Sequence, residues 1–172
     1  ATWQFDISFV ERGGPSPQRT ADGHQAPPLS AERTEQANAW LNEMFGTPWQ
    51  MMAGWYVFGE EVGNRIDLLT NPDGSSELSA RIDLRSDPSQ FISNICELGN
   101  LVNCALFSAE LCRLIEPVST DIAQCIKTSR AAAFVQNPTE FLKKIAGGAN
   151  NSFKPSPLRG LGTTRFALGG PA

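Results

Sequence analysis

Apolar and polar residues alternate through the first ten positions of the chain, and this pattern predicts a half-buried β-strand over residues 3–10. The face that we expect to be buried carries Trp3, Phe5, Ile7 and Phe9. Residues 12–29 then contain four prolines and three glycines without any periodicity. A segment of this length and composition is typical of a loop that is either functional or mobile.

Four later segments carry apolar residues at the three- and four-residue spacing of an amphipathic helix. They cover residues 30–46, 87–100, 119–133 and 137–148. Ser30, Asp87 and Asn137 stand at the start of three of these segments and are typical N-cap residues. Arg130 is expected in the last turn of the third helix, where a cation suits the helix dipole.

Three segments between the first two helices are predicted as strands, at residues 54–59, 64–70 and 77–85. The last two flank Asn71-Pro72-Asp73-Gly74, whose composition predicts a hairpin turn. Residues 101–116 fit either two short strands or a continuation of the second helix, and residues 165–168 are a candidate edge strand. The whole pattern predicts an α+β fold. We expect an antiparallel sheet of about four to six strands packed against about three to four helices, in a single domain over residues 1–172.

The composition is that of a globular protein, because 41% of the 172 residues are hydrophobic and 19% are charged. The chain has no run of 18 apolar residues and no secretory pattern at its N-terminus, so we expect a cytoplasmic protein without a membrane partner. The four cysteines lack the spacing of a metal site. We expect four buried thiols, with two disulfides in an exported protein as the alternative.

Charge is divided unevenly along the chain. Residues 1–117 carry 16 Asp and Glu against 7 Arg, a balance of −9. Residues 118–172 carry 7 Lys and Arg against 2 acidic residues, a balance of +5. No nucleic-acid motif accompanies these cations, so we expect no direct nucleic-acid partner. We interpret four of the cations as helix-terminal charges, namely Lys127, Arg130, Lys143 and Lys144.

Catalytic side chains are scarce in this sequence. His24 is the single histidine, nothing ties it to a particular Cys or Ser, and we interpret it as a solvated loop residue. No phosphate loop and no cluster of metal ligands is evident, so we expect neither a cofactor nor a metal ion. A hydrolase is the alternative if a group of carboxylates converges in a cleft, and that group is Glu60, Glu61, Asp67 and Asp83.

The acidic residues between positions 60 and 87 adjoin an apolar stretch that contains Met51 and Met52 between two tryptophans. Aromatic side chains and methionine in an acidic surround are typical of the core and rim of a protein-binding face. Core packing of the tryptophans is the alternative, and the 12–29 loop is an alternative contact element. The candidate partner-binding residues are Trp49, Trp55, Glu60, Glu61, Asp67 and Asp83.

Three segments carry a family resemblance. They are Trp55-Tyr56-Val57-Phe58-Gly59, Arg81-Ile82-Asp83-Leu84-Arg85, and Ser129-Arg130-Ala131 through Phe134-Val135-Gln136-Asn137-Pro138 to Phe141-Leu142. Together they resemble small bacterial immunity proteins, and most of all the immunity protein 52 family, over roughly residues 50–145. Members of that family are encoded beside contact-dependent or secreted toxins that have a restriction-endonuclease-like nuclease fold. The resemblance brings no inhibition motif that maps onto individual positions of this chain.

The resemblance implies an immunity protein of bacterial competition, without enzymatic activity, that binds a type VI secretion nuclease effector. An acidic, aromatic-bearing face suits this role, because a surface that binds DNA phosphates is basic. Two other functions stay open at this point. One is a carboxylate-based hydrolase, and the other is a scaffold or chaperone for secreted cargo.

Overall fold

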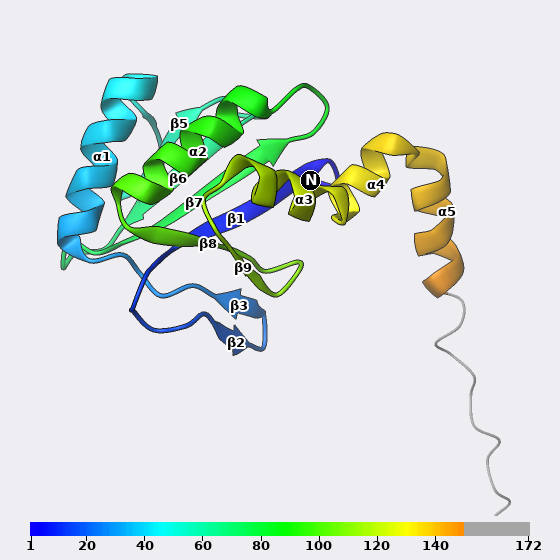
Figure 1. Ribbon diagram of the computed structural model, residues 1–172, viewed down its shortest axis with the longest axis horizontal. Coiled ribbons are helices and arrows are strands. Elements are labelled where there is room, and N and C mark those ends of the chain that lie inside the picture. Colours follow the sequence, from blue (N-terminus) through cyan, green and yellow to red (C-terminus); the bar gives the residue numbers. More distant parts are fainter. Residues whose placement is uncertain (150–172) are drawn as a thin grey trace, which may run out of the picture.

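The computed structural model describes residues 1–149, and its centre is a seven-stranded antiparallel sheet with the strand order β4-β5-β6-β7-β1-β8-β9 (Figure 1). Its strands are β1 (Gln4–Glu11), β4 (Trp49–Met52), β5 (Trp55–Gly59), β6 (Arg65–Thr70), β7 (Ser76–Asp83), β8 (Cys104–Ser108) and β9 (Arg113–Ile115). A separate hairpin pairs β2 (Gln18–Thr20) with β3 (Gly23–Gln25). The α+β class and the antiparallel sheet are confirmed, although the sheet is wider than expected.

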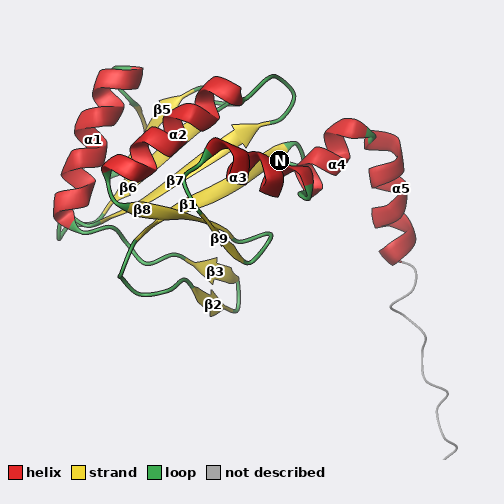
Figure 2. Cartoon of the chain, viewed as in Figure 1, coloured by secondary structure: helices red, strands yellow, loops and turns green. Residues whose placement is uncertain are grey.

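Five helices lie within the described residues. They are α1 (Ala31–Phe45), α2 (Ser89–Leu101), α3 (Ser119–Lys127), α4 (Arg130–Gln136) and α5 (Pro138–Ala149). Figure 2 shows α1, α2 and α3 on the same face of the sheet, whereas α4 and α5 lead away from it. No helix within residues 1–149 lies on the opposite face of the sheet, which we call the helix-free face.

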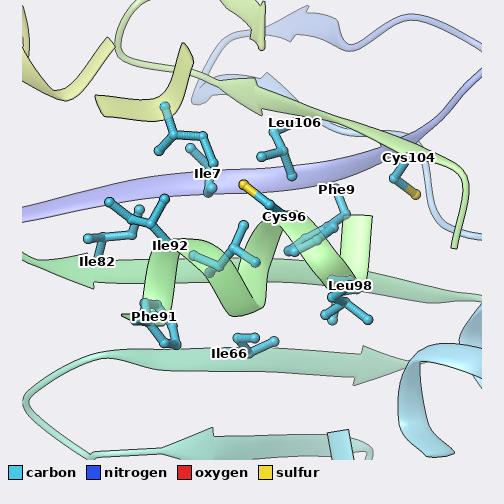
Figure 3. Close-up of a cluster of buried hydrophobic side chains, with 14 of the residues drawn as sticks. Ile7, Phe9, Ile66, Ile82, Phe91, Ile92, Cys96, Leu98, Cys104 and Leu106 are labelled. Atoms are coloured by element: carbon cyan, nitrogen blue, oxygen red, sulfur yellow. The ribbon is translucent and has the colours of Figure 1, made fainter. Parts of the chain in front are cut away.

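The hydrophobic core fills the space between the sheet and these three helices (Figure 3). The alternation predicted for the first strand is confirmed, since Phe5, Ile7 and Phe9 are buried while Asp6 is exposed. Helix α2 supplies the opposite wall of the core. Each fully buried Leu, Ile or Phe side chain contributes roughly 1.5–3 kcal/mol through the water that it excludes. The buried side chains of α2 are Phe91, Ile92, Ile95, Cys96 and Leu98.

Helix α1 begins and ends where the sequence predicts. Ser30 caps its first turn, since the Ser30 hydroxyl accepts a hydrogen bond from the backbone N–H of Arg33. Gly46 ends the helix with a φ of +77°, a conformation that glycine adopts without steric cost. Ala37 and Leu41 are buried against the sheet, which explains why this helix lies beside β5.

The helix-free face of the sheet is formed by every second residue of each strand. The β2–β3 hairpin covers part of it, because the His24 ring packs edge-on against Phe107 of β8, with 5.5 Å between the ring centroids. Residues 12–29 are therefore not without structure, as the sequence suggested, but contain this hairpin. None of the helices in the described part of the chain has the length and apolar character needed to cross a membrane.

Of the two alternatives for residues 101–116, the two short strands are confirmed, and they form the β8–β9 hairpin. Other expectations need correction. The expected third helix is two helices, because the Ser129 hydroxyl accepts a hydrogen bond from the backbone N–H of Ala132 and starts α4. Arg130 therefore begins α4, while Lys127 does lie in the last turn of α3. Strand β4 was missed, and the candidate strand at 165–168 lies outside the described residues.

Candidate partner-binding site

Two of the candidate contact residues, Trp49 and Trp55, lie on the helix-free face. Trp49 is opposite Val57, and Val57 is opposite Asp67, so these three side chains form one row across β4, β5 and β6. Trp55 lies two residues before Val57 and points to the same side. Both indoles are half-buried and Val57 is fully buried, which leaves an apolar platform with exposed edges.

Asp67 lies within this platform and is only 9% exposed. One carboxylate oxygen, Oδ1, accepts a hydrogen bond of 2.9 Å from Nε1 of Trp55. The other, Oδ2, accepts one of 3.0 Å from Nε of Arg65, which is 6% exposed. Asp67 is therefore a buried, paired carboxylate and not an exposed one, and its part in partner binding stays a prediction. A buried carboxylate needs compensating donors, and Asp67 uses both of its oxygens to hold Arg65 and the Trp55 indole.

Asp83 has a similar place at the end of β7 and is 4% exposed. Its carboxylate accepts hydrogen bonds from Nε and Nη2 of Arg85, at 3.0 and 2.5 Å. These hydrogen bonds from Arg85, together with the guanidinium charge, lower the pKa of Asp83 although its burial opposes the shift. Asp83 is therefore also buried and paired with an arginine, and its part in partner binding stays a prediction.

The two arginines converge on one loop, residues 60–64, which we call the clamped loop. Arg65 donates from Nη1 to the carbonyl of Glu61 at 3.1 Å, and Arg85 donates from Nη2 to the carbonyl of Val62 at 3.1 Å. The loop is closed at its base by a hydrogen bond of 2.9 Å from the N–H of Glu60 to the carbonyl of Asn64. Each buried aspartate thus acts on this loop through an arginine.

Glu60 and Glu61 are the exposed acidic residues of the candidate set, and the clamped loop carries both. Val62 beside them is 59% exposed, and at the far end of β5 the edge strand β4 ends in Met52, which is 58% exposed. Strand β5 separates the two ends. At about 3.3 Å per residue, roughly 17 Å lie between Trp55 and Glu60. One standard protein interface, with about 800 Å² on each partner, is wide enough to cover both.

The charge of this face differs from the sequence-based picture of a continuous acidic surface. Arg81 of β7 forms an ion pair with Asp6 of β1, with 3.0 Å between Nε and Oδ1. Together with the pairs of Asp67 and Asp83, this places three arginines opposite three aspartates. The acidic character at this end of the sheet is therefore concentrated on the clamped loop.

Sequence reasoning missed the role of Arg65 and Arg85. A usable signal was present, because Arg65 and Asp67 are two residues apart within a strand, as are Asp83 and Arg85 at a strand end. Residues at this spacing share a face of a strand, so each pair could have been expected to neutralise itself. Sequence reasoning also missed the contact of His24 with Cys112, which is 88 positions away.

The site presents the carboxylates of Glu60 and Glu61 and the indoles of Trp49 and Trp55 on a well-ordered sheet edge, an arrangement suited to binding a partner. Among residues 1–149, no three His, Cys, Asp or Glu side chains come together in a group that could hold a metal ion. No protein-family model, no curated protein and no solved structure matches the chain.

Proposed function

We propose that the protein is a cytoplasmic immunity protein that binds and neutralises a bacterial nuclease toxin, a type VI secretion effector. One observation supports the proposal most. The exposed carboxylates of Glu60 and Glu61 stand on a loop that two arginines hold in place, on the same sheet edge as the half-buried tryptophans of β4 and β5. A binding surface of this kind needs little reorganisation when its partner arrives, which lowers the entropic cost of association.

Charge complementarity supports a nuclease as the partner. A protein that binds the phosphate backbone of DNA presents Lys and Arg side chains at its active site. Glu60 and Glu61 would attract such a surface, raise the rate of encounter and compete with the phosphates. The aspartates on the same face contribute less, because arginines neutralise them.

The tryptophans suit the role of buried anchors. Trp residues are enriched among the few side chains that dominate interface energetics. Asp67 fixes the indole of Trp55 by a hydrogen bond of 2.9 Å, so this side chain has little rotational freedom to lose on binding. Truncation of a contact of this kind costs about 2 kcal/mol or more of binding free energy.

The test uses the product of the adjacent gene, which the proposal predicts to be the toxin. Purified protein at an equimolar ratio should abolish its DNA cleavage, and the double variant Glu60→Gln/Glu61→Gln should bind more weakly. Glu43→Gln is the matched control, because Glu43 is an exposed carboxylate at the end of α1. Undiminished DNA cleavage at equimolar ratio would refute the proposal, and equal weakening by the control would refute the role of the clamped loop.

The two alternatives receive less support. General acid catalysis needs a carboxyl group with a raised pKa, whereas Arg85 lowers the pKa of Asp83 and Asp67 is committed to Arg65. A scaffold or chaperone for secreted cargo would use the same surface. It differs in that the bound effector would continue to cleave DNA, so the same assay separates the two functions.

A further inference from the structure

The four cysteines of the chain differ sharply in their surroundings. Cys96, Cys104 and Cys125 are buried, whereas Cys112 is exposed, so the expectation of four buried thiols is wrong for one of them. Burial raises the pKa of Cys96 and raises that of Cys104 to about 12. Thiol reactions proceed through the thiolate, so burial protects these two residues and accessibility singles out Cys112.

Cys112 lies beside the only imidazole of the chain. It stands in the turn between β8 and β9, and its Sγ is 3.3 Å from Nε2 of His24 on β3. Figure 1 shows the β2–β3 hairpin next to the β8–β9 hairpin, which brings the two residues together. The His24 ring is also held from the side by Phe107. The imidazole is therefore placed by packing as well as by its contact with sulfur.

We infer that Cys112 and His24 form a reactive-thiol site that undergoes exchange with low-molecular-weight disulfides. A thiol is activated when a base within hydrogen-bond reach accepts its proton. In the first step the proton of Cys112 passes to Nε2 of His24. Sγ then attacks one sulfur of the disulfide, a new S–S bond forms to Cys112, and the old S–S bond breaks as the second sulfur leaves as a thiolate. This modification site is independent of the function proposed for the clamped loop.

The charges around the pair are mixed. On the His24 side, Arg19 stands opposite His24 in the hairpin, Asp22 lies in its turn, and Glu77 of β7 lines the same cavity of about 220 Å³ as His24. On the Cys112 side, Glu110 and Arg113 flank the thiol along the chain. Glu110 is occupied, since its carboxylate accepts a hydrogen bond from the backbone N–H of Arg130. Arg113 is thus the cation next to Cys112 along the chain, and a control has to address it.

The experiment follows the reaction of the folded protein with the aromatic disulfide dithiobis(nitrobenzoate) through the absorbance of the released thiolate. We expect one fast-reacting thiol per chain, which Cys112→Ser removes. His24→Gln should lower the rate at neutral pH about tenfold, a modest effect for a general base at an exposed site. Imidazole added to His24→Ala should restore the rate, because it replaces the lost base.

Two controls separate the base from its surroundings. Gln25→Ala changes the exposed neighbour of His24 on β3 and should leave the rate as it is. Arg113→Gln removes the cation beside Cys112 and should change the rate less than twofold. The inference is overturned by a fast phase that survives in Cys112→Ser, an unchanged rate in His24→Gln, a failure of imidazole to restore the rate, or an equal loss in Arg113→Gln.

Discussion

Replacement of Asp67 by alanine should destabilise the protein far more than the same replacement of an exposed acidic residue. The change leaves the guanidinium of Arg65 in a site that is 6% exposed, without its carboxylate partner, and removes the acceptor of the Trp55 indole N–H. Breaking a buried ion pair by removal of one partner costs about 3–5 kcal/mol, because an uncompensated charge stays buried. That is a large part of a total stability of about 5–15 kcal/mol.

The assay is urea unfolding followed by tryptophan fluorescence, with the free energy of unfolding extrapolated to water. Asp67→Asn is the informative companion, because its amide oxygen can still accept from Trp55 while the charge that compensates Arg65 is lost. The double variant Arg65→Met/Asp67→Leu should recover most of the stability, since an apolar pair of similar volume replaces the ions. A loss below about 1 kcal/mol in Asp67→Ala would refute the reasoning, because exposed ion pairs contribute no more than that.

Three further outcomes follow from the same structure. Gly59→Ala should lower the free energy of unfolding by at least about 2 kcal/mol in urea titrations, because Gly59 has a φ of +105° and an added Cβ would lie 2.5 Å from the carbonyl oxygen of Asn64. Ile95→Ala, at a fully buried position of α2, should cost about 2–5 kcal/mol in the same measurement. Asp83 has a lowered pKa in the folded state, so the stability that it contributes is present above about pH 4 and is lost as the pH falls through its folded pKa. Acid titrations of Asp83→Asn should accordingly show a weaker pH dependence than the wild type, and equal slopes would refute the role of its pair with Arg85.

Local patterns were enough to predict most of the elements. The alternation in residues 3–10 predicted β1, and the composition of residues 71–74 predicted the β6–β7 hairpin. Ser30 predicted the start of α1. Such signals lie within a few residues of the element that they specify, so they can be read from one chain segment.

Long-range contacts could not be predicted in the same way. Strand β4 has no alternating burial, because it is an edge strand with a register shift between Gln50 and Met52. The meeting of His24 with Cys112 depends on two hairpins that are far apart in the sequence. The burial of Asp67 depends on the neighbouring strands, which place Trp55 and Val57 around it. None of these three features is determined by the residues of a single short segment of the sequence.

Substitutions of the exposed carboxylates and of the buried carboxylates should affect partner binding by different mechanisms. Glu60 and Glu61 are solvated, so their attraction to a basic partner acts over a distance and is screened by salt. Asp67 instead holds Arg65, and through it the backbone of the clamped loop. Arg65→Met/Asp67→Leu, which leaves the net charge unchanged, would weaken binding by releasing that loop, and the remaining affinity would keep the salt dependence of the wild type. Glu60→Lys/Glu61→Lys would weaken binding and reduce its salt dependence. A salt series therefore distinguishes the electrostatic attraction of the loop from its positioning.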